Sequence, residues 1–112
     1  MVYYNLNEGQ GMSWKVRFTK DVENKLKNDF KRGNITIEDI KIIKVWRNRI
    51  EQFGPEKIRE IPVYDDHKLD KQWKGYRSSC FSSSGRIIYR IIDDEIIVEV
   101  VRITPDHNYG KE

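Results

Sequence analysis

Two polar clusters in the sequence carry side chains that exchange protons. Near the C-terminal end, an acid, an imidazole, a phenol and an amine occur together at Asp106, His107, Tyr109 and Lys111. The second cluster runs from Tyr64 to Lys68 and contains the other of the two histidines, His67. An imidazole takes and returns protons near neutral pH, and a phenol ring stacks on an unpaired base. These residue types are candidates for acid–base chemistry on a nucleic acid.

Basic side chains lie between the two clusters in the sequence, at Lys74, Arg77, Arg86 and Arg90. A guanidinium offers planar, bidentate donors to a phosphate. A base, a cation and an acid suffice to cleave RNA without a metal, because the base activates the 2′-hydroxyl, the cation stabilises the phosphorane and the acid protonates the 5′-oxygen. Each residue taken alone is more often an ordinary solvated side chain. Their combination is what points to chemistry.

The composition limits the class of protein. The 112 residues include 38% apolar and 12% aromatic residues, enough for one core, and the net charge is a mild +3. No apolar run is long enough for a membrane span and no signal peptide is recognisable, so we expect a cytoplasmic protein with no membrane partner. The single Cys80 excludes an internal disulfide and a cysteine-rich zinc site. Asp65, Asp66 and His107 form only a weak metal set, so we expect no metal and no cofactor.

The first half of the domain predicts one strand and two helices. Apolar and basic residues alternate over 14–18, as in a half-buried strand. Thr19 is a candidate N-cap for a helix whose apolar stripe is Val22, Leu26 and Phe30. A second helix is expected from Thr36, with Asp39 completing a capping box, to Phe53, where Gly54-Pro55 stops it. We expect the two helices to form an antiparallel pair.

The second half predicts a meander of strands over 76–82, 86–92 and 96–103, after a loop over 56–72. The strand at 14–18 must join the same sheet, because it has no other neighbour. The expected fold is α+β in the order β-α-α-β-β-β, with two antiparallel helices packed on a twisted, mainly antiparallel four-stranded sheet. Residues 1–12 are expected to be a flexible N-terminal extension, and 13–112 a single domain.

This topology brings the candidate residues together. Along strand 86–92, Arg86 lies at the first position, on the face opposite Ile87 and Tyr89. Antiparallel neighbours reverse direction, so strand 96–103 ends beside the start of strand 86–92. Asp106, His107 and Tyr109 are therefore expected to converge on Arg86 at one end of the sheet.

The ordered set of motifs from Ser13 onward resembles the RelE/ParE superfamily of type II toxins. The motifs are WKVRFTK at 14–20, DHKLxxxWKGYR at 66–77, GRIIYRI at 85–91, DDEIIVEV at 93–100 and DHNY at 106–109. The segment 66–77 is most similar to the YafQ branch, and the His-x-Tyr ending is similar to YoeB- and HigB-like members. The resemblance implies a RelE-like fold.

The resemblance also implies a function, that of an mRNA interferase. Such a toxin is a ribosome-dependent endoribonuclease that cuts mRNA in the A site without a metal and leaves a 2′,3′-cyclic phosphate. It implies a cognate antitoxin, and operator DNA contacted only through the antitoxin complex.

Site roles are carried over by position. Arg86 matches the arginine that stabilises the scissile phosphate, His107 the C-terminal acid or base, Tyr109 the aromatic that positions substrate and His67 the loop histidine of the YafQ branch. Lys74 and Arg77 match a basic strand start that contacts backbone phosphate, and Asp106 and Lys111 complete the expected substrate-binding set.

Two alternatives remain open at this point. The YafQ branch has a further histidine after its Lys-Gly-Tyr-Arg motif, where this chain has Ser78-Ser79-Cys80, so the division of base and acid between His67 and His107 is undetermined. Cys80 in that place is a poor proton shuttle unless its thiolate is stabilised. The rival function is a ParE-type toxin, which inhibits DNA gyrase by protein binding and has no nuclease activity.

Overall fold

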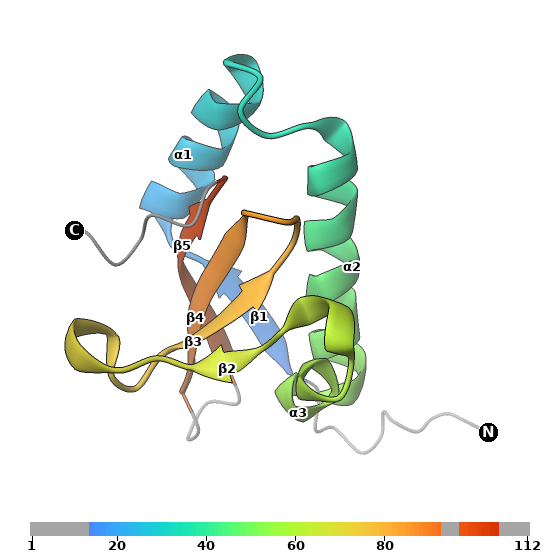
Figure 1. Cartoon of the computed structure of the whole chain (residues 1–112), viewed down its shortest axis with the longest axis vertical. Helices are drawn as coiled ribbons and strands as arrows, with labels where there is room; N and C mark the ends of the chain where they lie inside the picture. The colour runs from blue at the N-terminus through green and yellow to red at the C-terminus, as the bar shows by residue number, and fades with distance from the viewer. Residues whose placement is uncertain (1–13, 93–96, 106–112) are drawn as a thin grey trace.

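The computed structural model describes residues 14–92 and 97–105 (Figure 1). The predicted extension over 1–12 lies outside these residues. The elements are β1 (Lys15–Phe18), α1 (Lys20–Lys31), α2 (Ile37–Phe53), α3 (Pro55–Arg59), β2 (His67–Lys68), β3 (Arg77–Cys80), β4 (Arg86–Ile92) and β5 (Ile97–Thr104), with single 3-10 turns η1 (Pro62–Tyr64) and η2 (Lys71–Trp73).

Both long helices begin at the predicted caps. The Thr19 hydroxyl accepts a hydrogen bond from the backbone N–H of Val22 at 3.3 Å, which satisfies one of the free donors of the first turn of α1. At α2, the N–H of Asp39 donates to Thr36 Oγ1 at 3.1 Å and the N–H of Thr36 donates to Asp39 Oδ2 at 3.0 Å. This reciprocal pair is the capping box that the sequence predicts.

The strands form one mixed sheet in the order β1-β5-β4-β3-β2. β1 runs parallel to β5, and the other three pairings are antiparallel. The α+β class, the β-α-α-β-β-β order and the meander are confirmed. The structure adds a fifth, two-residue strand, β2, and the short helix α3, both mainly within the segment predicted as a loop. Two residues are too few to show a period, and the Pro55 that ends α2 also suits the first position of the next helix.

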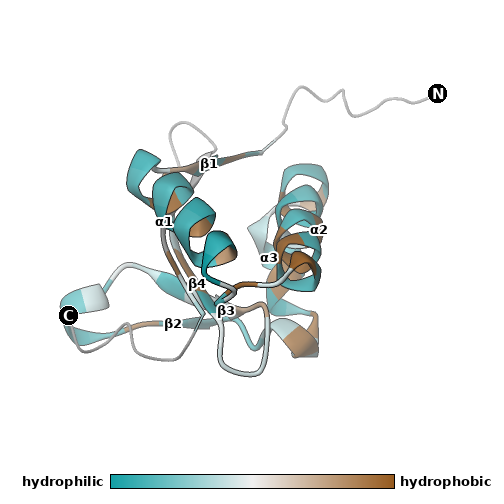
Figure 2. Cartoon of the chain, turned by 90° about the horizontal axis from the view of Figure 1, so that it is seen from above, coloured by the Kyte–Doolittle hydropathy of each residue, from teal (hydrophilic) through white to brown (hydrophobic). Residues whose placement is uncertain are grey.

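The core lies between the sheet and the helices. Trp46 and Ile50 from α2 meet Ile87 and Tyr89 from β4, and all four side chains are fully buried. The rings of Trp46 and Tyr89 pack edge to face with centroids 5.3 Å apart. Figure 2, coloured by hydropathy, shows β4 as hydrophobic and α1 as hydrophilic over most of its length.

The two long helices contact different strands. α1 packs against β5, whereas α2 packs against β1 and α3, so the sheet carries both helices. Two residues expected in the apolar stripes are exposed instead: Phe30, at 48%, and Phe53, at 61%. Both occupy the last turn of their helix, where the expected stripe continues past the part of the helix that contacts the core.

Gly54 connects α2 to α3 with a positive φ of +91°, and a Cβ there would lie 3.1 Å from Nε1 of Trp14. Gly33 also has a positive φ, +78°, but a Cβ there meets nothing within 4 Å. We expect Gly54→Ala to lower the free energy of unfolding by about 1–3 kcal/mol. Gly33→Ala is the control that carries the backbone strain alone. Urea unfolding of the two variants measures the difference, and equal losses would contradict the close contact with Trp14.

Candidate active site

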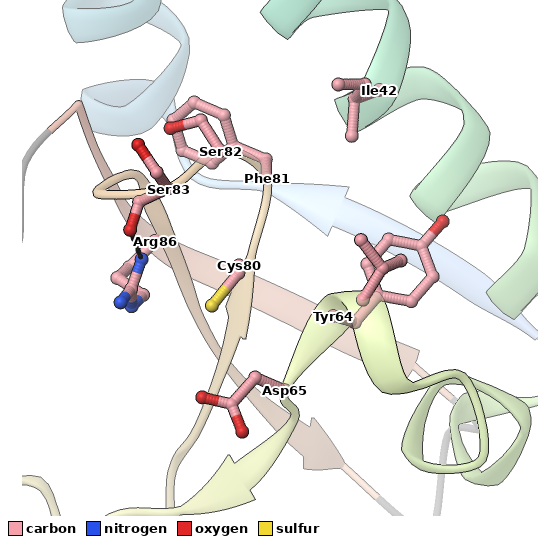
Figure 3. Close-up of a pocket in the computed structure, with 9 residues that line it drawn as sticks. Ile42, Tyr64, Asp65, Cys80, Phe81, Ser82, Ser83 and Arg86 are labelled. Atoms are coloured by element: carbon pink, nitrogen blue, oxygen red, sulfur yellow. Dashed lines mark hydrogen bonds between the residues drawn. The ribbon is translucent and has the colours of Figure 1, made fainter.

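Arg86 begins β4 and lines a hollow of about 450 Å³. Its Nη1 donates to the backbone oxygen of Gly85 at 2.9 Å and to that of Ser83 at 3.4 Å, which holds the guanidinium over the β3–β4 turn. Its Nε is buried and has no hydrogen-bond partner among the described residues. Figure 3 shows Cys80 between Arg86 and Asp65, with Ile42 and Tyr64 across the hollow. Arg86 therefore supplies a positive charge to the wall of a concave surface.

The backbone register places the end of β5 beside Arg86. Arg86 pairs with Thr104, and the hydroxyl of Ser84 donates to the backbone oxygen of Pro105 at 3.1 Å. The predicted adjacency of the two strand ends is thereby confirmed as far as Pro105. Four predicted site residues, Asp106, His107, Tyr109 and Lys111, lie outside the described residues.

His67 opens the edge strand β2, where it pairs with Ser78 of β3, and its side chain is exposed. Ring Nδ1 lies 2.8 Å from the backbone oxygen of Asp65. A carbonyl oxygen only accepts hydrogen bonds, so Nδ1 carries the proton of the neutral ring and Nε2 keeps its lone pair. The geometry thus gives His67 the tautomer of a proton acceptor.

The sheet places His67 and Arg86 on one face. Ser78 pairs with both His67 and Ile88, and cross-strand partners share a face, as do Arg86 and Ile88 by alternation along β4. Two strand spacings, about 10 Å, and one two-residue step along the strand separate them. A ligand bound across this face can therefore contact both side chains.

The side chain of Asp66 lies on the opposite face and is fully buried. Its Oδ1 accepts from Arg77 Nε at 2.6 Å, and its Oδ2 accepts from Ser79 Oγ at 2.6 Å and from the Tyr89 hydroxyl at 2.5 Å. Burial, together with the nearby Asp66 carboxylate, raises the pKa of Tyr89 far above its usual value, so this phenol stays a donor. The cluster Asp66–Arg77–Ser79–Tyr89 is thus a closed polar network beside the core.

Arg77 is therefore not a freely exposed cation. Its side chain is 14% exposed and paired with Asp66. Burial opposes its charge, but the hydrogen bond and charge of Asp66 raise the pKa of the guanidinium overall, so it remains cationic. Arg77 and Lys74 line a second hollow, of about 620 Å³, which shares no lining residue with the hollow at Arg86. The structure brings His67 and Arg86 onto one face and puts Lys74 and Arg77 elsewhere.

Cys80 lines the hollow beside Arg86, at a pairing position directly opposite it. Burial raises the pKa of the thiol; Arg86 lowers it, and the nearby Asp65 and Asp66 raise it further. The net direction is upward, so the thiolate is a minor form near neutral pH. Cys80 does not have the environment of a substitute for a proton-shuttling histidine.

Among residues 14–92 and 97–105, no three His, Cys, Asp or Glu side chains lie close enough to hold a metal ion. No helix in that part of the chain has the length and apolarity needed to cross a membrane.

Comparison with solved structures identifies the fold as the RelE-like fold of small bacterial toxins. YafQ and YoeB are among the toxins whose solved structures it matches. The crystal structure of YafQ from Escherichia coli superposes with a TM-score of 0.63 at 21% identity, covering 80% of this chain and 90% of that one. YafQ in the E. coli DinJ–YafQ complex gives a TM-score of 0.64 at 19% identity, over 88% and 96% of the chains.

The Staphylococcus aureus YoeB–YefM complex gives a TM-score of 0.61 at 15% identity, over 81% of this chain and 94% of that one. No protein-family model matches the chain, and no curated protein sequence matches it either. At these identities the comparisons establish the fold. The resemblance noted in the sequence is therefore confirmed at the level of fold.

Sequence reasoning missed the role of Asp66. The sequence identifies Asp66 only as an acid beside His67, as part of a weak metal set and as the first residue of the motif at 66–77. Asp66 directly precedes the strand that His67 opens, and the two side chains lie on opposite faces; this alternation is hidden in the sequence because 56–72 is predicted as a loop. A carboxylate that alternates with an exposed histidine is placed toward the core, where it requires partners.

The Cys80 environment makes a prediction about thiol reactivity. Because the pKa is raised, alkylation by iodoacetamide at pH 7.5 is expected to be slower than that of a free cysteine peptide and to accelerate as the pH rises through and above 9. Mass spectrometry of the alkylated protein over time measures the rate. Rapid alkylation at pH 7 would contradict this assignment and restore Cys80 as a candidate nucleophile or proton shuttle.

Proposed function

We propose that this chain is the toxin of a type II toxin–antitoxin system and acts in the cytoplasm as a ribosome-dependent endoribonuclease. Arg86, His67, His107 and Tyr109 form its active site. Asp106 and Lys111 contact substrate beside these residues, whereas Lys74 and Arg77, which line the second hollow, contact a more distant part of the RNA backbone. The reaction is acid–base cleavage of mRNA through the 2′-hydroxyl.

The pairing of Arg86 with Thr104 is the observation that carries this proposal. His107 follows Thr104 by three residues, and three residues span at most about 11 Å. The chain connectivity alone therefore keeps the His107 backbone within that distance of the strand position opposite Arg86. This limit supports a site shared by Arg86 and His107.

The His67 tautomer supports a division of roles between the histidines. Nε2 of His67 is an acceptor because Nδ1 donates to Asp65, so His67 suits the base that removes the 2′-hydroxyl proton. His107 is then the acid that protonates the leaving oxygen. This assignment rests on the observed geometry at His67 and on the chain's single remaining histidine.

The reaction then balances without an added reactant. The base takes the 2′-hydroxyl proton, and the 2′-oxygen forms a bond to phosphorus while the bond to the 5′-oxygen breaks. The acid delivers a proton to that 5′-oxygen, which leaves as a hydroxyl, and the other fragment ends in a 2′,3′-cyclic phosphate. Arg86, which lines the hollow and pairs with Thr104 at the end of β5, stabilises the charge that grows on the phosphoryl oxygens.

Partners follow from the proteins that share the fold. Solved YafQ and YoeB structures include the toxin–antitoxin complexes DinJ–YafQ and YoeB–YefM. We therefore expect this chain to bind a cognate antitoxin that covers Arg86, and to contact operator DNA only within that complex. The mRNA and the ribosomal A site are its expected targets.

Arg86→Ala tests the phosphate role. The variant is expected to lower cleavage about 10²–10³-fold and to abolish growth arrest, while the fold persists because the side chain is not in the core. Arg32→Ala removes an exposed arginine after α1 and is the control. Primer extension on mRNA after induced expression maps the cuts. Inhibition of gyrase supercoiling without mRNA cleavage would instead indicate the ParE-type function.

His107→Gln tests the acid. A glutamine hydrogen-bonds but carries no exchangeable charge near neutral pH, so cleavage is expected to drop about 10²–10⁴-fold. Quantifying 2′,3′-cyclic phosphate ends on mRNA from programmed ribosomes measures the rate. Full activity of this variant would exclude His107 from the reaction and leave His67 without its partner.

A further inference from the structure

Asp66 is a buried charged group that the proposed reaction does not use. Its carboxylate is fully buried and accepts three side-chain hydrogen bonds, from Arg77 and Ser79 of β3 and from Tyr89 of β4. A carboxylate enters a protein interior only with such partners, because an unpaired buried charge is strongly unfavourable. The network therefore fixes which residue of the 65–68 segment points inward.

Fixing Asp66 also fixes His67. Successive residues of an extended segment point to opposite faces, so an inward Asp66 requires an outward His67, on the face that carries Arg86. A register slip of one residue would exchange the two and bury the imidazole. The turn before them is set as well, since Asp65 adopts φ = +44° and its backbone oxygen meets Nδ1 of His67.

The strand cannot hold this register by itself. β2 contains only His67 and Lys68, paired with Ser78 and Arg77 at the edge of the sheet. One further backbone bond, from Leu69 N to the oxygen of Tyr76 at 3.0 Å, closes the loop. Strands of two residues are well below the usual length and carry few ladder bonds, so the Asp66 network supplies the missing constraint.

The geometry points to Asp66 as a positioning residue: its contacts with Arg77, Ser79 and Tyr89 lock the register of β2 and so hold His67 on the Arg86 face with Nε2 available as a proton acceptor. This inference rests on the proposed function for the role of His67. The register lock itself is a property of the fold and is measurable without activity.

The test is nuclear magnetic resonance of the two imidazole rings, assigned with His67→Gln and His107→Gln. Nitrogen shifts report which ring nitrogen carries the proton. Samples carry Arg86→Ala, so that the protein can be produced without its antitoxin. In this protein we expect His67 protonated at Nδ1. When Asp66→Asn is added, we expect His67 to become a mixture of tautomers. In protein that keeps Arg86, we expect Asp66→Asn to lower kcat about 10- to 100-fold with little change in KM.

Asp29→Asn is the matched control. Asp29 is another buried acid, 5% exposed and paired with Lys25 at 2.6 Å on α1, so this substitution removes a comparable charge away from β2. It is expected to lower Tm and to leave the His67 tautomer unchanged. Should Asp66→Asn fail to fold, Tyr89→Phe keeps the carboxylate with two of its three donors and is expected to shift the tautomer in the same direction to a smaller extent.

Each outcome decides between the claims. A tautomer shift with Asp66→Asn or Tyr89→Phe, absent with Asp29→Asn at similar Tm, supports the register lock. An unchanged His67 tautomer in folded Asp66→Asn or Tyr89→Phe overturns it and leaves Asp66 a merely stabilising residue. The tautomer can shift while His67→Gln, in protein that keeps Arg86, still cleaves mRNA at the full rate. In that case the register lock by Asp66 is supported and the proposed role of His67 as the base is overturned.

Discussion

A carboxylate buried against the core is the interaction on which the arrangement of this site depends. Asp66 satisfies its charge with an arginine, a serine and a tyrosine drawn from two strands, and it does so one residue before the histidine of the candidate site. The hydrogen bonds that satisfy the buried Asp66 carboxylate therefore also place the His67 side chain on the outer face. An edge strand of two residues, otherwise prone to slippage, becomes a defined platform.

Much of the fold follows from local patterns. The capping box at Thr36, the stop at Gly54 and strand 86–92 are all recognisable from residues within a few positions of one another, and all are confirmed. The segment 56–72 is different. Its helix α3 has five residues and its strand β2 has two, so neither completes enough periods to be distinguished from a loop.

The site was predictable to a different extent. Arg86 at the start of β4 follows from alternation and antiparallel order, and the register confirms its place beside the end of β5. The partners of Asp66 lie 11, 13 and 23 residues away in the sequence. Periodicity identifies the face of a residue but not its cross-strand partner. Arg77 therefore resembles a free phosphate-binding cation in the sequence, whereas in the structure it is largely occupied.

The parallel pairing of β1 with β5 has a consequence for synthesis on the ribosome. β5 lies between β1 and β4, so Lys15–Phe18 gains its partner only once residues 97–100 have been made. Throughout translation of the first 96 residues, the nascent chain lacks β5, the interior strand that joins β1 to β4 and ends beside Arg86. Contacts between residues far apart in the sequence generally slow folding. The ribosome has therefore made most of the chain before the sheet can be completed.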